Sequence, residues 1–321
     1  MEILSPFPVN APESQGVSSE AIQQVIGQIR QENGLDLHSF LCLRHGQLIW
    51  EEYFHTGEKE NLHVLHSVSK SFTSTAIGLA VDEGLLSLND KLYDFFPEYA
   101  YLCNSDFKKK VTIKDLLVMG SGFENREREM MYCLLEGGLT AAALAMPVIH
   151  EPGSKFDYYT IGTFLLSAAF SKVCPEGVHH YLRRKLFDPM GFGPTQWNVD
   201  NDGIPLGGTG LFMRAYDMAR LGQFYLQEGQ WQGNQLLSKA YAKAAGEKQI
   251  ENVHDGGLNW IGGYGYQFWR NAFGGFRADG MKGQFIIIIP EKDMVVVMTS
   301  NLENMEIPLV ALEKTLLSKV V

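Results

Sequence analysis

Strand-like segments gather near the two ends of this chain, and helical patterns fill its middle. Near the N-terminus, residues 38–43 and 48–54 are two apolar runs around a short turn, which predicts a hairpin. Near the C-terminus, three more runs cover residues 264–270, 283–289 and 294–299. Because short links join neighbouring strands in antiparallel order, the sequence predicts an α+β fold. Its antiparallel sheet would be flanked by helices and built from both chain termini.

The region between these strands determines the expected domain organisation. Residues 85–255 contain helical periodicity and loops rather than strand patterns. A length of 321 residues also favours about two domains. We therefore expect a discontinuous α/β sheet domain from residues 1–84 and 256–321, with residues 85–255 inserted as a mainly helical domain.

The charge of the chain argues against two classes of partner. It has 27 basic and 37 acidic side chains, a formal net charge of −10, and no basic tract longer than Lys108 to Lys110. Nucleic acids and anionic membranes both bind clustered cations, so we expect neither as a partner. No stretch approaches the roughly 18 consecutive apolar residues of a membrane-spanning helix.

The expected location is cytoplasmic. The first ten residues have no basic region, apolar region or cleavage site of a secretory signal. The cysteines are widely scattered, which predicts reduced thiols, and they form no zinc-binding pattern with histidine. No glycine run has the spacing of a nucleotide-binding loop. We expect neither a metal nor an organic cofactor. The four cysteines are Cys42, Cys103, Cys133 and Cys174.

The motif with the clearest chemical meaning is Ser67-Val-Ser-Lys70, at the start of a predicted helix over residues 67–83. Residues three apart share a helix face, so the Lys70 amine can reach the Ser67 hydroxyl. Amides at a helix N-terminus favour a developing oxyanion, and the same positive end favours a neutral, basic lysine. The alternative is a serine that caps the helix beside a solvated lysine.

The segment from His66 to Ser74 resembles the nucleophile segment of the serine β-lactamase and penicillin-binding-protein superfamily. It is most similar to the class C β-lactamase-like branch, which includes esterases, amidases and D-amino-acid peptidases. The resemblance implies the β-lactamase/transpeptidase-like fold. The similarity continues along the chain in family order, through residues 84–92, 112–117, 152–158, 207–211, 217–220, 283–284 and 290–296.

The resemblance implies roles for the first two motifs. Ser67 matches the acylated nucleophile and Lys70 its base partner. The second motif of the family is Tyr-x-Asn; here Tyr158 matches the tyrosine and Thr160 replaces the asparagine. A phenolate beside an ammonium can take the serine proton and pass it to the leaving group. The adjacent Tyr159 is the alternative to Tyr158 in this role.

The third motif of the family is a cationic triplet that ends in glycine, on an edge strand. Residues 278–280 match this triplet, and Gly280 keeps the glycine, which allows a close approach of the backbone to a ligand. The resemblance then implies an oxyanion hole made by the backbone amides of Ser67 and Met281.

Two substitutions in these motifs bear on the substrate. Thr160 offers one donor where asparagine offers two, so it is less suited to the acylamide group of β-lactams and peptides. The usual carboxylate-binding cation is missing, because Ala278-Asp279-Gly280 stands where the cationic triplet would be. Lys282 is either its substitute or a solvated lysine. Trp260 and Trp269 could line a pocket or pack in the core.

Together these observations predict a serine hydrolase that cleaves an ester or amide through an acyl-enzyme on Ser67. The expected substrate is a small-molecule ester, amide or peptide-like compound, and a neutral one fits the missing cation. One alternative is a true β-lactamase or D-Ala-D-Ala carboxypeptidase. The other is a non-catalytic binding or sensor module on the same fold.

Overall fold

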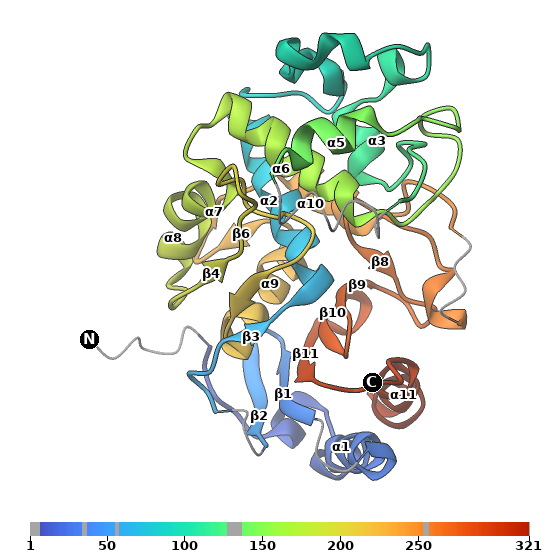
Figure 1. The fold of residues 1–321 in the computed structure, drawn as a ribbon. Helices are drawn as coiled ribbons and strands as arrows, with labels where there is room; N and C mark the ends of the chain where they lie inside the picture. Colours follow the sequence, from blue (N-terminus) through green and yellow to red (C-terminus); the bar gives the residue numbers. More distant parts are fainter. Residues whose placement is uncertain (1–6, 34–36, 55–57, 127–136, 253–256, 321) are drawn as a thin grey trace.

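Both ends of the chain form one antiparallel sheet of six strands, in the order β2-β1-β11-β10-β9-β8 (Figure 1). Each neighbouring pair runs antiparallel. The predicted α+β fold, with a sheet built from both termini, is confirmed. The structure is a computed structural model that describes residues 7–33, 37–54, 58–126, 137–252 and 257–320. The strands are β1 (Leu37–Arg44), β2 (Gln47–Tyr53), β8 (Trp269–Arg270), β9 (Phe276–Gly280), β10 (Gln284–Ile289) and β11 (Met294–Ser300).

The central strands of this sheet are buried on both faces. In β10, Ile286 and Ile288 belong to one hydrophobic cluster, whereas Phe285 and Ile287 belong to another on the opposite face. Helix α9 packs against β10 and β11, and helices α1 and α11 supply side chains to the second cluster. This two-sided burial explains why β10 is a continuous apolar run. These helices are α1 (Ser19–Asn33), α9 (Ala215–Leu226) and α11 (Glu306–Ala311).

A buried helix lies at the centre of the helical region. In α2 (Ser69–Asp82), every residue from Ser69 to Ala80 is buried, and the helix contacts α6, α7 and α10. The proposed division into domains remains a prediction; α9, from within residues 85–255, packs on the sheet. The other helices are α3 (Ile113–Leu117), α5 (Leu139–Ala145), α6 (Thr160–Val173), α7 (Gly177–Leu182), α8 (Asp188–Met190) and α10 (Lys239–Gly246).

Short strands complete the secondary structure. One small antiparallel sheet has the order β3-β5-β4, and a separate two-stranded ribbon joins β6 to β7. The bond from the Leu65 amide to the Leu211 carbonyl oxygen (2.8 Å) extends the small sheet toward the segment that carries Ser67. These strands are β3 (His63–Val64), β4 (Gln196–Trp197), β5 (Leu211–Met213), β6 (Gln230–Trp231) and β7 (Asn234–Gln235).

The local structure differs from two predicted elements. The strand expected over residues 264–270 is reduced to β8, because a turn closed by the bond from the Gly265 amide to the Phe268 carbonyl oxygen (2.8 Å), with Gln267 at a φ of 62°, interrupts it. A Cβ atom on Gly265 would lie only 2.0 Å from the Ala245 carbonyl oxygen. The end of α10 therefore occupies the space beside this segment. The helix expected from residue 67 begins instead as a 3-10 turn, His66–Val68, which leads directly into α2.

The cysteines and the lengths of the helices complete the description of the fold. Cys42, Cys103 and Cys174 carry free thiols, whereas Cys133 lies outside the described residues. Within the described ranges, no helix combines the length and apolar character needed to cross a membrane.

Candidate active site

Ser67 lies in a tight turn that places it at the start of a buried helix. The preceding residue, His66, has a φ of 47°, in the left-handed region that non-glycine residues rarely occupy. Strained backbone of this kind is found at functional sites more often than elsewhere. Ser67 itself is half-buried, so its hydroxyl lies near the surface while α2 continues into the interior.

Lys70 extends its amine back to Ser67. Its Nζ donates to Ser67 Oγ (2.9 Å), to Thr160 Oγ1 (3.2 Å) and to the Gly208 carbonyl oxygen (2.9 Å). The side chain is buried, with a relative exposure of 1%. An ammonium has three N–H donors, and these three acceptors surround it. The predicted neighbours Ser67, Lys70 and Thr160 are therefore brought together by the fold.

Tyr158 and Tyr159 point into different surroundings. Lys70 Nζ lies 4.9 Å from the centroid of the Tyr158 ring, which is within the range of a cation–π contact. The other contacts of Tyr158 include Trp269, on which it stacks with ring centroids 5.2 Å apart. Tyr159 is buried in the hydrophobic core near Phe123. Of the two tyrosines, Tyr158 is thus the one beside Lys70.

Gly208 is a site residue that the sequence analysis did not single out. Its carbonyl oxygen accepts from Lys70, and a Cβ atom there would lie 2.8 Å from the Thr160 carbonyl oxygen. Only glycine allows this loop to approach the start of α6 so closely. The glycine-rich stretch of residues 207–210 was the available signal.

Strand β9 ends against the turn that carries Ser67. A Cβ atom on Gly280 would stand 2.3 Å from the Leu65 carbonyl oxygen, so this glycine permits contact between the strand and the segment just before Ser67. Met281 follows the end of β9, and its side chain is exposed. The expected close approach at Gly280 thus involves protein backbone.

The carboxylate of Asp279 is held by two neighbours that the motif did not predict. Trp260 Nε1 donates to Asp279 Oδ2 (3.0 Å), and Arg277 Nε donates to the same oxygen (2.9 Å). The Arg277 guanidinium also lies over the Trp260 ring, 4.9 Å from its centroid. Asp279 is therefore part of a buried cluster with an arginine and an indole.

Lys282 is directed toward an acidic partner. Its Nζ forms an ion pair with Glu303, whose side chain is exposed. Burial lowers the pKa of the His66 imidazole, and the charge of nearby Lys282 lowers it further. Lys282 thus lies near the Ser67 turn with its ammonium paired to Glu303; its part in substrate binding remains a prediction.

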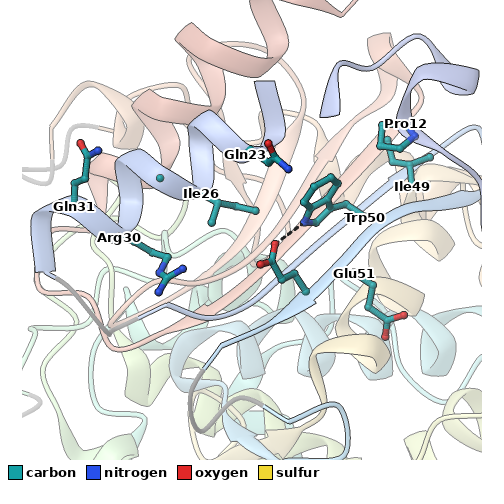
Figure 2. A pocket seen from close by; sticks show the side chains of 10 residues that line it. Pro12, Gln23, Ile26, Arg30, Gln31, Ile49, Trp50 and Glu51 are labelled. Atoms are coloured by element: carbon teal, nitrogen blue, oxygen red, sulfur yellow. Dashed lines mark hydrogen bonds between the residues drawn. The ribbon is translucent and has the colours of Figure 1, made fainter. Parts of the chain in front are cut away.

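A separate hollow on the surface contains none of these residues. It has a volume of about 760 Å³ and lies between α1 and β2, lined in part by Ile26, Arg30 and Trp50 (Figure 2). The part of the chain that the structure describes contains no group of three or more histidine, cysteine, aspartate or glutamate side chains arranged to hold a metal ion.

Comparison with known proteins gives one family match over most of the chain. A family model described as Beta-lactamase matches residues 22–313. The chain is also 25% identical over 286 residues to the 6-aminohexanoate-dimer hydrolase of Paenarthrobacter ureafaciens, a match that covers 82% of this chain and 72% of that protein.

Solved structures agree on the fold. The octameric penicillin-binding protein homologue from Pyrococcus abyssi superposes with a TM-score of 0.73 and 22% identity, over 92% of this chain and 78% of that one. EstCE1, described as a hydrolase with promiscuous acyltransferase activity, gives a TM-score of 0.73 and 18% identity, over 91% of this chain and 97% of that one.

Proposed function

Because the chain belongs to the beta-lactamase family of hydrolases, we propose that it is a serine hydrolase that cleaves a neutral ester or amide through an acyl-enzyme on Ser67. The observation that carries this proposal is the 2.9 Å contact between Lys70 Nζ and Ser67 Oγ, with Tyr158 against the same amine. A nucleophile within hydrogen-bond reach of a base, beside a third orienting group, is the usual arrangement for covalent catalysis.

The proton is proposed to pass between Ser67, Lys70 and Tyr158. Ser67 Oγ attacks the substrate carbonyl carbon, and its proton passes to the deprotonated member of the Lys70–Tyr158 pair, either a neutral Lys70 amine or a Tyr158 phenolate beside the Lys70 ammonium. The same pair then delivers that proton to the departing alcohol or amine. Water subsequently adds to the acyl-serine ester, and the acid and the free Ser67 hydroxyl are released. The acceptors Thr160 and Gly208 fix the direction of the Lys70 amine.

The tetrahedral intermediate needs donors that face the developing oxyanion. We assign this role to the backbone amides of Ser67 and Met281, because β9 packs on the Ser67 turn through Gly280. Fixed amides of this kind stabilise an oxyanion strongly, since they need no reorganisation during the reaction.

A neutral substrate is favoured by the charges near Ser67. Lys282 is paired with Glu303, and Arg277 with Asp279. A carboxylate on the substrate would gain no unpaired partner from these two cations. The relative from Paenarthrobacter ureafaciens is named as a hydrolase of an aminohexanoate dimer, which supports an amide as one candidate bond.

The test is covalent labelling combined with turnover. Wild-type protein is treated with a fluorophosphonate, the adduct is mapped by mass spectrometry, and hydrolysis of short-chain p-nitrophenyl esters and D-aminoacyl amides is measured. We expect the adduct on Ser67 and a loss of turnover of roughly 10³-fold or more in Ser67→Ala. Ser154→Ala is the matched control, because Ser154 is exposed on a loop and should keep both label and activity. Equal turnover in Ser67→Ala would refute the proposal.

The β-lactamase or carboxypeptidase alternative has its own readout. Family membership and the Ser67–Lys70 pair are common to both functions, so the substrate must decide between them. We expect nitrocefin, an anionic cephalosporin, to be a poor substrate relative to neutral esters. Fast hydrolysis of nitrocefin would reverse this ranking.

A further inference from the structure

The Asp279 cluster has the composition of a carboxylate receptor. A guanidinium and an indole N–H converge on one carboxylate oxygen, with donor–acceptor distances of 2.9 and 3.0 Å. Charge-assisted bonds from arginine are among the strongest that a carboxylate makes in a protein. Here the carboxylate that fills the receptor belongs to the protein itself.

Arg277 depends on this carboxylate. Its side chain is fully buried, and burial lowers the pKa of the guanidinium, an effect that Asp279 opposes. Its Nη1 donates to Asn271 Oδ1 (3.0 Å). A buried arginine without an acidic partner is costly, because the charge is removed from water without compensation. The site therefore favours occupation by a carboxylate.

The guanidinium also retains unused donor capacity. Arg277 Nη2 is buried and has no hydrogen-bond partner among the described residues. The Nε and Nη2 hydrogens point to the same side of a guanidinium, the side that binds a carboxylate through two parallel bonds. On this side of the guanidinium, Arg277 Nε donates to Asp279 Oδ2. A carboxylate with more freedom of position could engage both donors.

The cluster lies beside the proposed nucleophile. Asp279 directly precedes Gly280, which contacts the backbone at Leu65, two residues before Ser67. The Asp279 side chain lies on the opposite face of β9, the face that Phe285 shares with Tyr264 and Trp269. Tyr264 provides a second link: its ring makes an edge contact with the Tyr158 ring, 6.2 Å between centroids. Burial raises the pKa of the Tyr264 phenol, and the proximity of Tyr158 and Asp279 raises it further. The Asp279 carboxylate and the Tyr158 ring thus both lie close to Tyr264.

We propose that Arg277 and Trp260 form a carboxylate-binding subsite beside Ser67 and that Asp279 fills it from within, which makes Asp279 the residue that excludes anionic substrates. The role of Asp279 in substrate selection rests on the proposed hydrolase function. An anionic substrate must displace Asp279 or accept repulsion from it, whereas a neutral ester or amide meets neither cost.

The first test measures carboxylate binding and requires no catalysis. In Asp279→Ser the subsite is vacated, and acetate should raise the thermal unfolding temperature of this variant relative to chloride at equal ionic strength. Wild-type protein should not respond, because its subsite is filled. The double variant Arg277→Leu/Asp279→Ser should not respond either, because the cation is gone. The absence of an acetate effect in Asp279→Ser would overturn the proposal.

The second test measures specificity with matched substrate pairs. We compare p-nitrophenyl hydrogen succinate with its methyl ester, and m-acetoxybenzoate with its methyl ester, so that the carboxylate lies in the acyl group of one pair and in the leaving group of the other. In Asp279→Ser, the ratio of kcat/KM for the anionic over the neutral member should rise about tenfold or more in at least one pair. The double variant should lose this gain. Unchanged ratios in both pairs would contradict the proposal.

The two tests distinguish their own failure from failure of the proposed function. If no variant hydrolyses any ester but acetate stabilises Asp279→Ser, the subsite stands and the hydrolase assignment falls. If Asp279→Ser folds only in the presence of acetate, that dependence is itself the expected binding. If it folds in neither salt, Asp279→Asn keeps an acceptor oxygen and removes the charge; its ratio should still rise, and an unchanged ratio would overturn the proposal.

Discussion

Two buried aspartates in this protein, Asp217 and Asp279, are both held by arginine in different surroundings. Asp217 accepts bonds on both carboxylate oxygens. Its Oδ2 accepts from Arg214 Nε (2.9 Å) and the Gly193 amide (3.1 Å), and its Oδ1 accepts from Arg220 Nη1. These arginines lie three residues before and three residues after Asp217, around the first turns of α9. The Asp217 cluster therefore stabilises a helix and its connection.

At Asp279, in contrast, both recorded donors reach one oxygen from different segments of the chain. Each cluster also includes a buried guanidinium N–H without a partner among the described residues, Arg220 Nε and Arg277 Nη2. Burial and pairing are thus common to both clusters. The difference is that Asp279 precedes the glycine that contacts the Ser67 turn. The two ion pairs therefore differ in their position relative to the proposed nucleophile, and the proposed role in specificity rests on that position.

The largest effect is expected when a substitution breaks the Asp217 cluster. Asp217→Ala removes the carboxylate that holds buried Arg220 and one of the two that hold buried Arg214, whose other partner is Glu60, and we expect a loss of about 3–5 kcal/mol in the free energy of unfolding. Denaturant unfolding measures this loss. The control is Asp188→Ala, whose exposed pair with Arg183 should contribute at most about 1 kcal/mol. Similar losses in the two variants would show that the Asp217 cluster contributes no more to the free energy of unfolding than an exposed ion pair does.

The next substitution is expected to move β9, which carries Asp279, away from the Ser67 turn. In Gly280→Ala the new methyl group would meet the Leu65 carbonyl oxygen at 2.3 Å. We expect a loss of about 1–3 kcal/mol in stability together with reduced ester turnover, because the strand must move away from Ser67. The matched control is Gly27→Ala in α1, where no atom lies within 4 Å of the new Cβ atom. That change should stabilise the protein by about 0.5–1 kcal/mol and leave turnover unchanged.

A smaller effect is expected from the indole donor at Asp279. Trp260→Phe keeps a ring but removes the bond to a charged acceptor, whereas Trp197→Phe removes a bond of 2.9 Å to the neutral Thr209 carbonyl oxygen. Both tryptophans have the same relative exposure of 7%. We expect Trp260→Phe to cost about 1 kcal/mol more unfolding free energy than Trp197→Phe, since bonds to charged groups are stronger. An equal or smaller cost would argue against an ionised carboxylate at Asp279.

The pH dependence of stability sets the range in which the two clusters can be compared. Burial, with a contribution from His38, lowers the pKa of His63 from 6.5 to about 4. The unfolded chain therefore binds this proton more tightly than the folded protein does. Stability from neutral His63 is fully present above about pH 6.5 and declines as pH falls toward 4. In His63→Phe, the loss of unfolding free energy across this window should be smaller than in the wild type, and identical losses would exclude this role.

The fold was largely predictable because its signals are local. Two apolar runs that a short stretch of sequence reveals correspond to β1 and β11; these are residues 38–43 and 294–299. The short turns between strands are local signals of the same kind. The shortened strand before β8 was not predictable. The turn over residues 265–268 interrupts it, and this turn packs on the end of α10, where the Tyr266 amide donates to the Ala245 carbonyl oxygen (3.1 Å), a contact between segments distant in sequence.

The proximity of Ser67 and Lys70 followed from their spacing, even though the turn is 3-10 rather than α-helical at Ser67. The same reasoning could not find Arg277 or the bond from Trp260 to Asp279. Both tryptophans named in the sequence are indeed buried, yet burial alone does not reveal that one indole N–H meets a carboxylate. Such contacts depend on how the loop before β8 folds over β9, for which the sequence carries no periodic signal.

The pairing of β1 with β11 also bears on the order in which the sheet can assemble during synthesis. The hairpin of β1 and β2 emerges early, and the edge of β1 that pairs with β11 stays open until the last strand is made. An open edge of this kind can pair with other chains. Ser67 likewise leaves the ribosome before Gly280, so a nascent chain carries the proposed nucleophile before the strand that packs beside it. Completion of the sheet and assembly of the proposed catalytic centre are therefore both expected to follow the synthesis of β11.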